Sequence, residues 1–200
     1  MVEPAAPPRP WRLCGGCRKP RPFVSSGKIR LNANGRRLDA WLIYRCIACD
    51  RTWNRTVAER IAVSSVPDAK LQAMHRSDPD WVRNREFDLA FLRRYSSRID
   101  LDCDLVVKKS PPQAVPWDWS IITLHIEAPW PTVIRLDRLL SNKLPISRSG
   151  LRAMERKGSV KIFPVPAASL KKPVLGRITV RFVASMLAEE HRAALAGQSL

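Results

Sequence analysis

Cys14-Gly-Gly-Cys17 and Cys46-Ile-Ala-Cys49 are two closely spaced cysteine pairs, and 28 residues separate them. Two such pairs let four thiolates converge on one tetrahedral Zn²⁺. The intervening chain is typical of a hairpin that brings the pairs together, because residues 28–33 alternate polar and apolar side chains and Asn34-Gly35 is a strong turn signal. We therefore predict a zinc ribbon over residues 1–56. Its expected metal ligands are Cys14, Cys17, Cys46 and Cys49.

This metal site is expected to be structural. Four sulfur ligands leave no open position on Zn²⁺, so the ion would not activate a water molecule. The alternative of a redox-active CxxC motif needs a single pair in a βαβ setting, which this stretch lacks. Basic side chains and aromatic rings also surround the cysteines. These rings could stack on nucleic acid bases, but we favour a role in the small core of the ribbon.

The charge of the chain is unevenly distributed. Its 200 residues carry a net charge of +17, and 45% of them are hydrophobic, so this charge belongs to a folded protein. Residues 1–56 carry +9, residues 57–134 carry −1, residues 135–181 carry +10 and residues 182–200 carry −1. Two basic segments thus flank a neutral middle, which indicates a polyanionic partner.

Several classes of protein are excluded by composition. The first ten residues lack the apolar region of a secretory signal, and no uncharged apolar run approaches the roughly 20 residues that cross a bilayer. Five cysteines, four of them in CxxC pairs, favour metal binding over a disulfide framework. We therefore expect a soluble cytoplasmic protein that does not bind membranes.

The middle segment, residues 57–134, is predicted to mix helices and strands. Helices are expected over 67–76 and 79–94, and alternating polarity predicts strands over 99–105 and 119–127. Asp100, Asp102 and Asp104 are expected to form a solvated strand face, and Cys103 a buried thiol. His125 and Glu127 are the nearest approach to an acid–base pair, and no catalytic motif accompanies them.

Residues 135–182 are predicted to fold as a helix, a turn, a second helix and a strand. Leu136, Leu139 and Leu140 recur at helical spacing, Ser147 can cap the second helix, and Gly158 suits its C-terminal end. In the second helix the residues at 148, 152 and 156 are all arginines and fall on one stripe. Guanidinium groups in such a row are suited to binding phosphates.

The motifs Arg135-Leu-Asp-Arg-Leu-Leu140, Ser147-Arg-Ser149 and Gly158-Ser-Val-Lys-Ile162 resemble the S-four RNA-binding domain, as do residues 172–180. This resemblance covers about a quarter of the chain. It implies that Arg135, Arg138, Arg148 and Arg152 face RNA phosphates, and that Leu136, Leu140 and Val160 belong to the core. Together with the charge pattern it predicts nine RNA-contacting residues: Arg135, Arg138, Arg148, Arg152, Arg156, Lys157, Lys161, Lys171 and Lys172. The alternative is a helix pair with a protein-docking or structural role.

A second resemblance covers the whole chain. The stretches at 23–35, 41–46 and 52–54 resemble an uncharacterised bacterial family of unknown function that begins with this cysteine-rich hairpin. This resemblance implies an architecture and brings no activity with it.

Together these observations predict an α+β protein: an N-terminal zinc ribbon, a mixed α/β middle, a C-terminal S-four-like helix-turn-helix-strand module, and a helix or tail over 183–200. The expected function is non-enzymatic binding of structured RNA, ribosomal or transfer RNA, through the two basic segments. One alternative is a transcription-associated zinc-ribbon factor that binds DNA or protein. A second is an RNA-modifying enzyme with its site in the middle segment.

Overall fold

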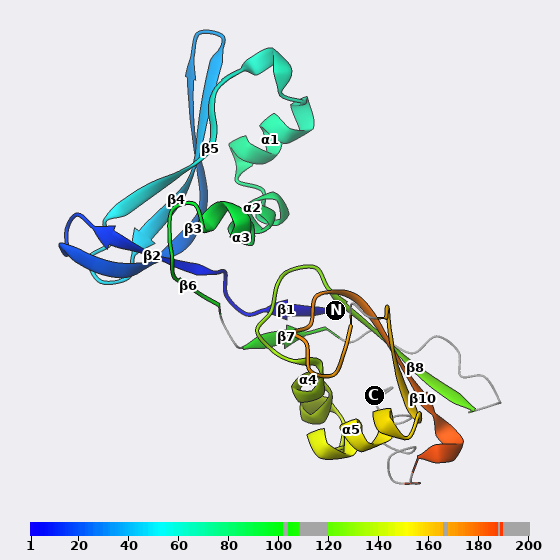
Figure 1. The fold of residues 1–200 in the computed structure, drawn as a ribbon. Helices are drawn as coiled ribbons and strands as arrows, with labels where there is room; N and C mark the ends of the chain where they lie inside the picture. The colour runs from blue at the N-terminus through cyan, green and yellow to red at the C-terminus, as the bar shows by residue number, and fades with distance from the viewer. Residues whose placement is uncertain (102–103, 109–119, 166–167, 188, 190–200) are drawn as a thin grey trace. The chain divides into compact units, whose positions relative to one another are not determined.

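The computed structural model of the chain describes all residues except 102–103, 109–119, 166–167, 188 and 190–200 (Figure 1). Asp102, Cys103, the first residue of the strand expected over 119–127 and most of the helix or tail expected over 183–200 therefore lie outside the described residues. The chain forms two compact units. We call Ala6–Asp102 the cysteine unit, and Met1–Ala5 with Cys103–Leu200 the arginine unit. No helix in the described part of the chain is long and apolar enough to span a membrane.

A five-stranded antiparallel sheet forms the framework of the cysteine unit, with strand order β5-β4-β3-β2-β6. Its strands are β2 (Arg9–Cys14), β3 (Lys19–Asn34), β4 (Arg37–Cys46), β5 (Thr52–Ala62) and β6 (Ile99–Asp100). The predicted hairpin is confirmed, and Gly35 sits in its turn with a φ of 58°. This conformation favours glycine because it has no Cβ.

Three helices pack on one face of this sheet: α1 (Asp68–Arg76), α2 (Pro79–Glu86) and α3 (Leu89–Leu92), after the short 3-10 turn η1 (Val63–Ser65) (Figure 1). The helix expected over 67–76 is confirmed as α1. The helix expected over 79–94 is divided, because Asp88 accepts a hydrogen bond from the backbone N–H of Phe91 and so caps a separate helix, α3.

The arginine unit has a three-stranded antiparallel sheet of order β8-β10-β9 and a separate pair β1-β7. The strands are β1 (Val2–Pro4), β7 (Leu105–Val107), β8 (Ile121–Ala128), β9 (Val160–Phe163) and β10 (Gly176–Val183), and the 3-10 turn η2 (Ala184–Met186) follows β10. The helices α4 (Leu136–Lys143) and α5 (Arg148–Arg156) pack on one face of the three-stranded sheet through a single apolar core.

Local predictions for this unit are confirmed. Ser147 caps α5 by accepting a 3.0 Å hydrogen bond from the backbone N–H of Gly150, and Gly158 has a φ of 77° just beyond the helix. Leu136, Leu140 and Val160 are buried, as the resemblance implied. The chain thus contains helices and antiparallel sheets, in agreement with an α+β class.

The division into two units differs from the predicted segments, which ended at residues 56 and 134. Residues 57–102 complete the cysteine unit, since α1 and α2 both contact β3. The strand expected over 99–105 is instead two short strands: β6 pairs with β2 in the cysteine unit, whereas β7 pairs with β1 in the arginine unit. The expected strand is divided because its two halves form hydrogen bonds with different strands, β2 and β1, which are distant from it in the sequence.

Candidate functional site

The four cysteines predicted as ligands form one cluster in the cysteine unit. All four sulfur atoms lie within 4.8 Å of one another, with 3.5 Å between the Sγ atoms of Cys14 and Cys49 and 3.9 Å between those of Cys17 and Cys46. A tetrahedral ion with metal–sulfur bonds of about 2.3 Å places its sulfur ligands about 3.8 Å apart. The cluster therefore has the spacing needed to hold a metal ion.

The two cysteine pairs have matching backbone geometry. The residue after each pair, Arg18 or Asp50, has a positive φ, 53° and 57° respectively. Its N–H donates to the carbonyl oxygen of the first cysteine of the pair, at 2.7 Å for Cys14 and 3.0 Å for Cys46. A Cβ at Gly16 would lie 3.1 Å from the Cys49 sulfur, which is a tight contact, so glycine fits closely beside the cluster. Each pair is thus a tight turn with both thiols pointing into the cluster.

The thiols of Cys14 and Cys49 are influenced by their neighbours in the cluster. A hydrogen bond from the backbone N–H of Cys17 lowers the pKa of the Cys14 thiol to about 6. The N–H of Arg51 acts on Cys49 in the same direction, but the three neighbouring thiols outweigh it and raise the pKa of Cys49 to about 12. Because metal binding requires thiolates, a cation entering the cluster would displace the remaining protons.

Two of the aromatic rings near the cluster, those of Tyr44 and Trp53, belong to the core of the unit. Tyr44 is fully buried and Trp53 packs against the same apolar cluster. Two arginines also belong to this packing: the Arg12 guanidinium lies 4.1 Å from the centre of the Trp53 ring, and Arg55 is only 2% exposed and donates to the carbonyl of Arg85. Part of the basic charge of residues 1–56 therefore does not face solvent.

In the arginine unit, three of the predicted RNA-contacting arginines meet at one buried carboxylate. The Oδ2 atom of Asp137 lies 2.6 Å from Arg152 Nη2, 2.9 Å from Arg135 Nη2 and 3.4 Å from Arg148 Nη2. Asp137 belongs to the first turn of α4, and Arg148 and Arg152 lie one turn apart on α5. The carboxylate thus links the two helices.

Burial raises the pKa of Asp137, but the hydrogen bond from Arg152 and the charges of Arg135 and Arg148 outweigh burial and hold it below its ordinary value of 3.8. A carboxylate whose pKa is depressed by folding contributes stability that is fully present above the ordinary pKa and is lost as pH falls through the folded-state value.

We therefore expect Asp137→Asn to be less stable than the unmodified protein at pH 7, with a difference in unfolding free energy that shrinks below about pH 4. Urea unfolding of both proteins at pH 7 and pH 3 checks this. Glu155→Gln, which changes an exposed acid on α5, serves as the control. A difference that stays constant with pH would contradict the ion-pair interpretation.

The other predicted RNA contacts are distributed around the unit. Arg138, Arg156 and Lys157 are exposed on the two helices or at their ends. Lys171 and Lys172 lie in a loop beside the N-terminal end of α4. There the backbone N–H of Leu136 donates a hydrogen bond to the carbonyl oxygen of Lys172.

Lys161 lies elsewhere, on the exposed face of β9, opposite Arg181 and on the side of the sheet away from the core. The nine residues therefore do not form one surface.

Two residues of this region were missed by sequence reasoning. Asp137 is the buried counter-ion of the three arginines. Residues 135–181 contain twelve basic residues and only two acidic ones, so an acidic residue in this segment could have been singled out from the sequence as a candidate ion-pair partner. Arg181 is exposed and stacks 5.0 Å from the centre of the Phe163 ring, but its place beside Lys161 follows only from strand register.

The described acidic and histidine residues considered for catalysis are divided between the two units. His125 and Glu127 are exposed on β8, where they contact Thr179 and Arg177 at 3.3 Å. Asp100 belongs to the cysteine unit and accepts a hydrogen bond from the Trp11 indole.

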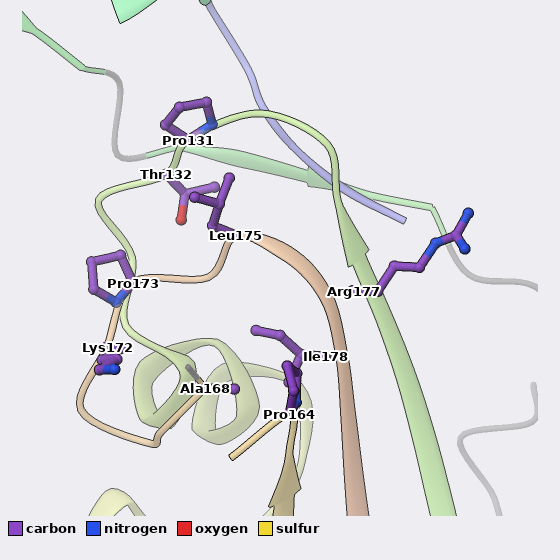
Figure 2. A pocket seen from close by; sticks show the side chains of 9 residues that line it. All are labelled: Pro131, Thr132, Pro164, Ala168, Lys172, Pro173, Leu175, Arg177 and Ile178. Carbon is purple, nitrogen blue, oxygen red and sulfur yellow. The ribbon is translucent and has the colours of Figure 1, made fainter. Parts of the chain in front are cut away.

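Figure 2 shows a separate open pocket of about 380 Å³ in the arginine unit, and the Arg177 side chain extends away from its other residues. Among the described residues that line it there is no histidine or carboxylate. The residues that line the pocket are Pro131, Thr132, Pro164, Ala168, Lys172, Pro173, Leu175, Arg177 and Ile178.

The fold and its site define a two-unit protein of helices and antiparallel sheets with a four-cysteine cluster able to hold a metal ion. Residues 31–164 match the family model described as "Protein of unknown function (DUF1062)", and the chain therefore belongs to this family. The match spans the second cysteine pair and the helices α4 and α5. Comparison with the curated proteins and with the solved structures gave no match.

Proposed function

We propose that this chain is a non-enzymatic, zinc-containing protein that binds structured RNA. The single observation that carries the RNA-binding part is the cluster of three guanidinium groups around Asp137, which sets partly exposed positive charge on a helix pair. Its resemblance to the S-four domain and its position in the segment of charge +10 support the same partner.

Zinc is the metal that this cluster favours. Four thiolates in tetrahedral spacing suit Zn²⁺, and the complete sulfur set gives the ion a structural role. Elemental analysis of the purified protein should give one zinc per chain. Iron in its place, or no metal, would contradict this part of the proposal.

RNA binding should depend steeply on salt, because phosphate contacts release condensed counterions. If six or more phosphates are contacted, the affinity for a labelled transfer RNA should fall by roughly 10³ between 50 and 200 mM salt. Filter binding over this range measures the effect. A flat profile would overturn the proposal, since contacts that depend on other chemistry do not release counterions.

A second candidate is a transcription-associated factor that docks on protein or DNA through the cysteine unit. It is favoured by two apolar side chains beside the cysteine pairs, because Leu13 is 72% exposed and Ile47 is 58% exposed. A competition experiment separates the two candidates. If the chain binds structured RNA, unlabelled structured RNA should displace the labelled transfer RNA far better than duplex DNA of equal length. If RNA and DNA displace it equally well, the result favours the transcription-associated factor.

A further inference from the structure

The arrangement around Asp137 is unusual because three guanidinium groups share one oxygen atom. The carboxylate is fully buried, and all three contacts use Oδ2, whereas Oδ1 has no hydrogen-bond partner among the described residues. A buried carboxylate is unfavourable unless it is paired with positive charge. Its ion pairs with Arg135, Arg148 and Arg152 therefore hold the three guanidinium groups in place.

The cluster keeps the capacity to bind an anion. Three positive charges meet one negative charge, so two remain uncompensated. The side chains of Arg135, Arg148 and Arg152 are still 37%, 46% and 37% exposed. Each guanidinium carries five N–H donors in a planar fork, and only one nitrogen of each contacts Asp137.

Without the carboxylate these three arginines would repel one another and sample many rotamers. Ordering a long side chain on binding removes conformational entropy, and a side chain that is already ordered avoids this loss. Asp137 therefore lowers the net charge of the surface while it increases the order of the groups that would contact a phosphate.

We propose that Asp137 is a positioning residue, which preorganises Arg135, Arg148 and Arg152 as a site for one phosphate group of the RNA backbone. This inference rests on the proposed function and adds a requirement to it. Positive charge alone is not sufficient, since the site needs a buried negative charge to hold its donors together.

Asp137→Asn tests the idea because charge and positioning predict opposite results. The substitution removes one negative charge and nearly preserves shape, so simple electrostatic attraction predicts tighter binding of transfer RNA. Positioning predicts a dissociation constant about tenfold higher, which corresponds to one or two side chains that must now be ordered on binding. The matched control is Glu155→Gln, which makes the same change in charge at an exposed position of α5 and should bind as tightly as the unmodified protein or slightly tighter.

A second variant keeps the test decisive if the buried substitution prevents folding. Arg148→Lys with Arg152→Lys preserves every charge but replaces the planar forks with single ammonium groups. We expect a dissociation constant about tenfold higher. Arg93→Lys, at an exposed position outside both basic segments, should leave it unchanged. Circular dichroism melting of each variant establishes that it is folded.

The outcomes separate the two proposals. If the unmodified protein binds transfer RNA with a steep salt dependence while Asp137→Asn binds as tightly or tighter, the positioning role is overturned and RNA binding stands. Equal affinity of the lysine variant and the unmodified protein overturns it as well. If the unmodified protein does not bind RNA, both proposals fail.

Discussion

Replacing Cys46 with serine is expected to abolish metal binding and to unfold the sheet of the cysteine unit. Cys46 is fully buried at the end of β4, within the apolar cluster that contains Phe23 and Tyr44. Binding free energies of structural zinc in small modules are about 10–16 kcal/mol, which equals or exceeds the net stability of most domains. Losing this contribution leaves the sheet without enough stability to fold.

Two measurements check this result. Elemental analysis should show zinc falling from one per chain to none, and hydrogen exchange should show lost protection in β3, β4 and β5. The strands β8 to β10 should stay protected, because they belong to a separate compact unit. Cys103→Ser is the matched control, since Cys103 lies outside both cysteine pairs. A Cys46→Ser protein that retains its zinc and its melting temperature would exclude the site.

The double substitution Arg148→Gln with Arg152→Gln should weaken binding of transfer RNA about 100-fold. Hydrogen bonds to charged groups contribute about 1.5–3 kcal/mol each, so two of them at the lower end account for this change. The salt dependence should also become shallower by roughly one for each lost phosphate contact. Glutamine is preferred to glutamate because a new carboxylate at either position would face the buried Asp137.

The control for this experiment removes the same amount of charge elsewhere. Lys70 and Arg93 are exposed and lie outside both basic segments, so their replacement by glutamine should change affinity only slightly. Filter binding at several salt concentrations, with thermal melts of both variants, measures the effect. Equal losses in the two double variants would mean that RNA binding responds to overall charge and not to the cluster.

The features of the fold that could be predicted from the sequence are those that depend on residues close together in the chain. The hairpin turn at Gly35, the Ser147 cap and the left-handed Gly158 follow from local backbone preferences. The four-cysteine cluster was also predictable, because the spacing within each pair fixes a tight turn and the hairpin brings the pairs together. These predictions depend on contacts within about one turn or one hairpin.

Other features depend on residues far apart in the chain, and only the tertiary structure decides them. Strand β1 pairs with β7 more than 100 residues later, which places the first five residues in the arginine unit and divides the expected strand at 99–105. The alternation of polar and apolar residues is the same for either pairing, so it could not reveal this break.

The candidate RNA surface shows the same limit. By itself the sequence determined the arginine stripe of α5 and the charge of +10, because helical periodicity and composition are local properties. It did not show that Asp137 is buried between the helices, or that Lys161 lies on the opposite side of the sheet. Those positions depend on how α4 and α5 pack on the sheet, since packing decides which charges are brought together and which are held apart.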